Sequence, residues 1–310
     1  MSTLDFSTKI GSKRFSNPIF TASGCASSGQ ELSQFFPLTE LGAIVTKSIM
    51  TKSRTGRLTP RMAETPSGML NSIGLQGPGI DAFLENDIPW LVEQKAKIIV
   101  SIAGETVDEY GVLSRRLRAI SGISAVEVNI SCPNVENRGQ VFACHPDTSV
   151  AVIEAVRRNI GGELPIIAKL SPDVTDIVEI AAAVINAGVD GLALINTLLG
   201  MVIDTNSMRP KLAGKTGGLS GPAIRPVAVR AIYQVHQAFP NTPIVGMGGV
   251  ASGRDAFELI LAGASAVSIG TASFGNPNAA MLVKNQLSDL LIERGFIDFR
   301  DAIGFAHRGV

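Results

Sequence analysis

The chain has 310 residues, with 27 lysine and arginine residues balanced by 27 aspartate and glutamate residues. A neutral chain has no electrostatic reason to bind nucleic acid or an anionic membrane, so neither partner is expected. With 45% hydrophobic and 17% charged residues, the composition fits a globular protein with a large core and excludes disordered and fibrous proteins.

Eight short β-rich segments follow one another along the chain, separated by amphipathic helical patterns. The predicted strands are 19–23, 43–48, 97–104, 125–131, 165–171, 191–197, 243–250 and 266–272. Helical patterns are clearest at 147–159, 174–187, 226–238 and 253–262. Eight such units in this length predict an α/β protein with a (β/α)8 TIM barrel, formed as one domain over residues 1–310. A turn at 11–12 predicts an N-terminal β-hairpin that closes the bottom of the barrel.

Polar and glycine residues gather at the C-terminal ends of these strands, where (β/α)8 barrels carry their chemistry. They are Ser23, Lys47, Ser48, Ser101, Asn129, Cys132, Lys169, Asn196, Thr197, Gly248, Gly249, Gly270 and Thr271. Buried polar groups cost free energy unless they are paired, so this accumulation predicts a binding site at one mouth.

The glycines after the last two strands predict an anion site. Gly248, Gly249 and Gly270 each precede a turn into a helical pattern. Backbone N–H groups at helix N-termini suit a phosphate, and barrels often bind phosphate in the loops after strands seven and eight. The alternative is that these glycines serve only tight turns.

Lys169 lies in an otherwise apolar strand, so its ammonium needs a negative partner. A reduced flavin ring offers one, a Schiff base is the rival use, and a structural salt bridge is the third possibility. Asn71, Asn129, Asn134 and Asn196 match the donor and acceptor edge of a pyrimidine. Lys47 suits a carboxylate or a flavin oxygen.

The three cysteines are Cys25, Cys132 and Cys144, too few and too scattered for a disulfide framework, with no Cys-x-x-Cys pair for zinc or an iron–sulfur cluster. Cys132, after the fourth strand, either removes a proton, forms an adduct or fills space. No histidine spacing indicates a metal site, and none is expected. The start of the chain has no apolar segment typical of a signal peptide, and the longest apolar run, 191–203, is shorter than the roughly 20 residues that span a bilayer. We expect a cytoplasmic protein.

The motifs at 22–24, 46–48, 71–75, 129–134, 168–170, 196–197, 217–221 and 246–249 resemble those of class 1 dihydroorotate dehydrogenase, nearly from end to end. The resemblance implies FMN in the barrel mouth and oxidation of dihydroorotate to orotate in pyrimidine biosynthesis. It implies that Cys132 takes the C5 proton while the C6 hydride passes to flavin N5.

The same resemblance assigns the other site residues. Substrate contacts are Lys47, Asn71, Ser72, Ile73, Gly74, Leu75, Asn129, Asn134, Asn196 and Thr197. FMN contacts are Ser23, Lys47, Ser48, Ser101, Asn129, Lys169, Ile195, Gly221, Gly248, Gly249, Gly270 and Thr271. Ser101 stands where many members of the family have asparagine.

The segments 135–147 and 198–223 look more like the NAD-linked (1B) type than the fumarate-using type, which is the alternative within the family. The NAD-linked type works with an electron-transfer subunit that carries FAD and an iron–sulfur cluster, and a homodimer is expected. Outside the family, the alternative interpretation of the sequence is a barrel lyase that forms a Schiff base on Lys169.

Overall fold

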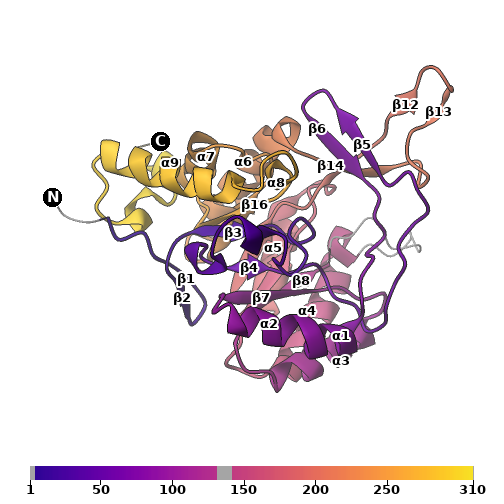
Figure 1. Ribbon diagram of the computed structural model, residues 1–310. Coiled ribbons are helices and arrows are strands. Elements are labelled where there is room, and N and C mark those ends of the chain that lie inside the picture. The colour runs from indigo at the N-terminus through magenta and orange to yellow at the C-terminus, as the bar shows by residue number, and fades with distance from the viewer. Residues whose placement is uncertain (1–3, 131–141, 310) are drawn as a thin grey trace.

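The computed structural model describes residues 4–130 and 142–309. Its centre is an eight-stranded parallel sheet in the order β3, β16, β15, β10, β9, β8, β7, β4 (Figure 1). The strands are β3 (Ile19–Thr21), β4 (Ile44–Val45), β7 (Ile98–Ile102), β8 (Ile123–Asn129), β9 (Ile166–Lys169), β10 (Gly191–Leu194), β15 (Ile244–Met247) and β16 (Ala266–Ile269).

The two outer strands of this order, β3 and β4, meet and close the barrel. Phe20 and Ala43 form a parallel bridge, and the Thr21 hydroxyl accepts a 2.8 Å hydrogen bond from the Val45 N–H. The (β/α)8 barrel predicted from the sequence is therefore confirmed. Each strand ends two or three residues before its predicted end.

Helices connect most of the strands on the outside of the barrel. They are α1 (Ile80–Ala82), η3 (Phe83–Asp87), α2 (Ile88–Glu93), α3 (Val107–Arg118), α4 (Pro146–Ile160), α5 (Ile177–Asn186), α6 (Arg225–Ala238), α7 (Gly253–Ala262), α8 (Ala272–Gly275) and α9 (Ala279–Glu293). The 3-10 turns are η1 (Leu32–Gln34), η2 (Leu38–Glu40), η4 (Phe142–Cys144), η5 (Pro222–Ile224), η6 (Phe299–Ala302) and η7 (Phe305–His307).

Local sequence explains where the helices begin. Asp176 caps α5 by accepting from the N–H groups of Val178 and Glu179, and Ser252 and Asp255 form a capping box at α7. None of the helices in the described ranges has the length and hydrophobicity that crossing a bilayer requires.

The inside of the barrel is packed with side chains that alternate along the strands. This buried cluster includes Val45, Ile99, Ile167 and Val245. The N-terminal hairpin of β1 (Thr8–Ile10) and β2 (Lys13–Phe15) adds Ile10 and Phe15 to the same cluster. The predicted hairpin therefore exists, and its apolar side chains fill one end of the barrel while the other end is left for the mouth.

A four-stranded antiparallel sheet that the sequence did not predict stands beside the mouth (Figure 1). Its order is β11 (Leu198–Gly200), β14 (Gly217–Ser220), β6 (Gly68–Asn71) and β5 (Met62–Thr65). A separate hairpin, β12 (Ile203–Asp204) with β13 (Arg209–Pro210), extends beyond it. In this sheet Gly218 pairs with Asn71, so two of the predicted motifs are neighbours.

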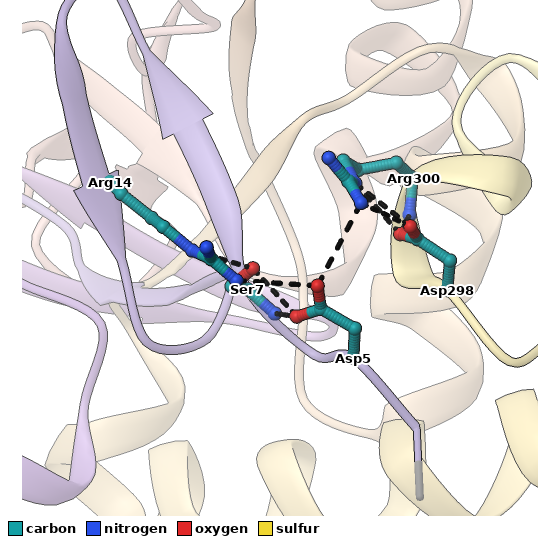
Figure 2. Close-up of polar contacts among 5 residues, drawn as sticks. All are labelled: Asp5, Ser7, Arg14, Asp298 and Arg300. Atoms are coloured by element: carbon teal, nitrogen blue, oxygen red, sulfur yellow. Dashed lines mark hydrogen bonds and ion pairs between the residues drawn. The ribbon is translucent and has the colours of Figure 1, made fainter. Parts of the chain in front are cut away.

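Ion pairs tie the N-terminal segment to the C-terminal turn η6, as Figure 2 shows. The Asp5 carboxylate accepts from the N–H and hydroxyl of Ser7 and lies 3.3 Å from Arg14 and 3.7 Å from Arg300. Arg300 also pairs with Asp298. The hydrogen bonds from Ser7 lower the pKa of Asp5, and the hydrogen bond from the Arg300 side chain lowers the pKa of Asp298.

These lowered pKa values predict that the local hydrogen bonds of Asp5 and Asp298 make an acid-sensitive contribution to stability. A carboxyl group with a lowered folded-state pKa stabilises the fold above its ordinary value of 3.8 and loses that contribution as the pH falls through the lowered value. We expect Asp298→Asn to be less stable than the parent chain at neutral pH and the difference to shrink on acidification. Urea denaturation at a series of pH values measures it. A difference that does not depend on pH would contradict the assignment.

Candidate active site

A cleft with two connected lobes opens at the C-terminal ends of the strands. The first, named here the glycine lobe, has a volume of about 320 Å³ and is lined by residues such as Gly221, Gly248, Gly249, Gly270 and Thr271. The second, the asparagine lobe, has a volume of about 300 Å³ and is lined by residues such as Lys47, Asn71, Asn129, Ile73 and Leu75. Both lobes are lined by Ser23, Cys25, Lys169, Asn196, Thr197, Ser220 and Thr271, so they are parts of one site.

Lys169 lies at the junction of the two lobes. It is the last residue of β9, and only 4% of it is exposed. Its Nζ donates to the Ser23 hydroxyl at 3.1 Å and lies 3.9 Å from Glu127 Oε1. The lysine therefore places a cation on the wall shared by both lobes, held between a hydroxyl and a carboxylate.

A chain of buried polar side chains continues from this ion pair around the barrel. The Ser101 hydroxyl donates to Glu127 Oε1 at 2.9 Å and lies 2.9 Å from the Ser48 hydroxyl, which accepts from Asn129 Nδ2 at 3.1 Å. Asn196 Nδ2 in turn donates to Asn129 Oδ1 at 3.4 Å. Such networks fix side-chain orientation because each member satisfies its neighbours. The amide groups that face the asparagine lobe are thus held in place before any ligand arrives.

The glycine lobe has the backbone that a phosphate needs. Gly248 and Gly249, directly after β15, have φ angles of +133° and +73°. A Cβ on Gly249 would lie 2.7 Å from the Gly221 carbonyl oxygen, so only glycine fits this turn. The lobe also contains the Ser268 hydroxyl, which is buried and has no hydrogen-bond partner among the described residues.

An unpaired buried hydroxyl is rare in a protein unless a ligand or water completes it. The glycine turn, the partnerless Ser268 hydroxyl and the Lys169 cation together fit a ligand that carries a phosphate at one end and an electron-rich planar ring at the other. The volumes of the two lobes also fall in the range of sites that bind small organic cofactors and substrates.

The asparagine lobe combines amide groups, a cation and apolar walls. Asn71 comes from the end of β6, and its Nδ2 donates to the Gly218 carbonyl of β14 at 3.3 Å, so the small sheet sets its position. Lys47 Nζ lies close to Gly24, 3.4 Å from where a Cβ would stand. Met62, Met69, Ile73, Leu75 and Phe274 complete the lining. This lobe suits a small planar anion with amide groups on its edge.

Most of the residues predicted from the sequence line this cleft. In the glycine lobe these are Ser23, Lys169, Ile195, Asn196, Thr197, Gly221, Gly248, Gly249, Gly270 and Thr271. In the asparagine lobe they are Ser23, Lys47, Ser48, Asn71, Ile73, Leu75, Asn129, Lys169, Asn196, Thr197 and Thr271.

Three predicted residues lie outside the lining. Ser101 is fully buried beneath it and is linked to the lining through Ser48 and, by way of Glu127, through Lys169. The Ser72 side chain is buried close to Gly214, and Gly74 lies against Arg57. Cys132 and Asn134 lie outside the described residues.

Other residues of the site were not singled out from the sequence. Glu127 is buried in β8 and pairs with Lys169. Ser220 faces both lobes and accepts a 2.8 Å hydrogen bond from Thr271. A charged residue inside an otherwise apolar strand is the signal that identified Lys169, and the same signal was available for Glu127.

Cys25 also lines both lobes. Burial raises the pKa of its thiol, an effect opposed by the positive charges of Lys169 and Lys47. A thiol with a raised pKa is protonated at neutral pH and is a poor nucleophile. Cys25 therefore contributes a small apolar surface to the cleft. The described residues contain no cluster of histidine, cysteine and acidic side chains that could hold a metal ion.

Comparison with known proteins agrees with this site. The family model described as dihydroorotate dehydrogenase matches residues 5–291. The chain is 51% identical to a protein of Desulforudis audaxviator over 94% of both chains, and 49% identical to one of Desulforamulus reducens over 98% of this chain and 99% of the other. It is 50% identical to a protein of Trichlorobacter lovleyi over 96% and 97%. Each relative is named dihydroorotate dehydrogenase B (NAD(+)), catalytic subunit.

The Gly249 turn gives a testable prediction. Gly249→Ala forces a left-handed φ on alanine and a close contact with the Gly221 carbonyl. Strain of this kind costs about 1–3 kcal/mol, so we expect a lower unfolding free energy and weaker binding of a phosphate-bearing ligand. Isothermal titration with FMN measures the binding.

Gly162→Ala is the matched control, because a Cβ there has no neighbouring atom within 4 Å. We expect this variant to bind FMN like the parent chain. Equal FMN affinity in the Gly249 and Gly162 variants would show that the turn after β15 does not hold the phosphate.

Proposed function

The chain belongs to the dihydroorotate dehydrogenase family, and on this premise we propose that it is the catalytic subunit of an NAD-linked enzyme of the B type. It is a flavin-dependent oxidoreductase that converts (S)-dihydroorotate to orotate in pyrimidine biosynthesis. The observation that carries the proposal is the position of Lys169 at the junction of two lobes, one suited to a phosphate and the other to a planar anion. Family membership favours this reaction over the Schiff-base lyase.

In this proposal FMN is the flavin, and the glycine lobe binds its phosphate. Gly248, Gly249, Gly270 and Thr271 present backbone and one hydroxyl to the phosphate, and Gly221 and Ile195 line the same lobe. Ser23, Lys47, Ser48, Asn129 and Lys169 contact the ring, with Ser101 supporting them from beneath. Bound FMN supplies the acceptor for the hydride that leaves C6 of dihydroorotate.

The asparagine lobe binds dihydroorotate. The substrate has a carboxylate and a ring edge of alternating N–H and C=O groups. Lys47 offers the cation for the carboxylate. Donors and acceptors for the ring edge come from the side chains of Asn71, Asn129, Asn196 and Thr197. Ile73 and Leu75 contribute the apolar wall, while Ser72 and Gly74 shape the loop that carries them, and Asn134 is a further proposed contact.

Cys132 is the proposed base that takes the C5 proton. The assignment rests on the resemblance of its motif, since the residue lies outside the described part of the chain. A thiol with a reference pKa of about 8.5 removes a proton only in its thiolate form, so the reaction requires either an alkaline pH or a local cation.

The electron acceptor is proposed to be NAD, reached through an electron-transfer subunit that carries FAD and an iron–sulfur cluster. The names of the relatives support it, because they combine NAD(+) with the words catalytic subunit. We further propose one FMN-binding domain over residues 1–310, a homodimer, and a cytoplasmic enzyme, the last in keeping with three scattered cysteines.

An assay with different acceptors tests the proposal. The purified chain is given dihydroorotate with fumarate, a quinone or NAD in turn. We expect no turnover of fumarate and reduction of NAD only after a second protein carrying FAD and an iron–sulfur cluster is added. Efficient turnover with fumarate by this chain alone would exclude the NAD-linked assignment.

Substitution of the base gives a second test. We expect Cys132→Ser to lower the rate of flavin reduction by about 10²–10⁴-fold, the usual contribution of a positioned base. Because serine is a weaker acid than cysteine, the rate should continue to rise to a higher pH than in the parent enzyme. Stopped-flow measurement across pH, with Cys144→Ser as the control, is decisive. An unchanged pH profile would rule out Cys132 as the base.

A further inference from the structure

Glu127 is a buried carboxylate that the reaction described above does not use. It lies on β8, two residues before Asn129, and is 2% exposed. Residues two apart on a strand point to the same face, so the two side chains are stacked along the inside of the barrel. On the neighbouring strand β9, Lys169 pairs in register with Asn129. Glu127 therefore lies one layer deeper than the residues that line the cleft.

One carboxylate oxygen of Glu127 contacts two neighbouring side chains. Its Oε1 lies 3.9 Å from Lys169 Nζ and accepts a 2.9 Å hydrogen bond from the Ser101 hydroxyl. Ser101 is fully buried and bound in turn to Ser48, which fixes the direction from which the hydroxyl approaches. Desolvation makes a carboxylate in such a place unfavourable unless a cation offsets its charge. Glu127 does not line either lobe, so it acts on a ligand by holding Lys169 and by its own electric field.

The electric field that Lys169 exerts on a bound ligand depends on Glu127. A cation next to a bound anion strengthens binding, and a carboxylate behind the cation weakens the same field. The Ser23 hydroxyl in the loop after β3 and the Glu127 carboxylate on β8 both contact Lys169 Nζ. Contacts from two elements limit where the cation can move.

We propose that Glu127 is a positioning residue that holds Lys169 at the junction of the lobes and offsets part of its positive charge. The inference rests on the proposed function, because it concerns the flavin that Lys169 would face. Its consequence is a flavin that accepts electrons less readily than Lys169 alone would make it, so that the reduced flavin can pass electrons to the next carrier.

The first measurement is the reduction equilibrium of the flavin-loaded enzyme against a reference dye. Glu127→Gln keeps the shape and the acceptor oxygen but removes the negative charge. We expect the equilibrium constant for flavin reduction to rise about tenfold, which for a two-electron couple is about 30 mV. Lys169→Met should lower the same constant.

Glu154→Gln on the surface of α4 is the matched control and should leave the constant unchanged. A Glu127→Gln variant with the parent constant, or a lower one, overturns the proposed offset of charge.

The second measurement does not depend on flavin or on activity. The full-length chain without flavin is denatured with urea as Glu127→Gln, as Lys169→Met and as the double variant. Removing one member of a buried ion pair leaves the other uncompensated. We therefore expect each single variant to lose stability and the double variant to lose less than the sum of the two single losses. Strictly additive losses would show that the two groups are not coupled and would overturn the inference.

The two proposals fail in different ways. A parent enzyme that binds no flavin or does not oxidise dihydroorotate contradicts the proposed function, whereas the urea cycle still reports whether Glu127 and Lys169 act as a pair. If the parent enzyme is normal but the stability losses are additive, only the proposed role of Glu127 is contradicted. The same holds if the flavin reduction equilibrium is unchanged in Glu127→Gln.

Discussion

A buried cation at the end of a parallel strand determines how the site is built. Lys169 is almost fully buried, yet it faces both lobes of the cleft, so it needs compensating groups and a polar ligand. Glu127 and Ser23 supply the compensation from neighbouring parts of the barrel. Ser101, Ser48 and Asn129 extend the polar network toward the asparagine lobe. The chemistry of both lobes is thus tied to one buried ion pair.

Contacts that stabilise the fold lie at one end of the barrel, and the candidate active site lies at the other. At one end Ile10 and Phe15 of the N-terminal hairpin pack into the strand interior, and the ion pairs of Asp5 and Arg300 join the two ends of the chain. At the other end the small antiparallel sheet beside the mouth sets the position of Asn71 through the pairing of β6 with β14. Glycine in that sheet and in the turn after β15 allows neighbouring segments beside the cleft to approach each other closely.

The fold could be predicted because the barrel strands are apolar runs with clear helical patterns between many of them. The small sheet was not predicted, since its strands are short and rich in glycine and come from segments far apart in the chain. Lys169 was recognised as a charge in an apolar strand, but its partner could not be named, because only the pairing of β8 with β9 brings Glu127 near it. Ser101 was assigned to the flavin, while the structure places it one layer below, between Ser48 and Glu127. Layers within a barrel depend on register, which residue patterns do not specify.

In the proposed enzyme, the Lys169 end of the barrel holds a flavin against dihydroorotate. Anaerobic titration of the purified, flavin-loaded chain with dihydroorotate tests it most directly, with the flavin absorbance as the signal. We expect the absorbance to bleach and to reach its end point at one equivalent of dihydroorotate per flavin. A flavin that stays oxidised through an excess of dihydroorotate, or a chain that cannot be loaded with flavin at all, would contradict it.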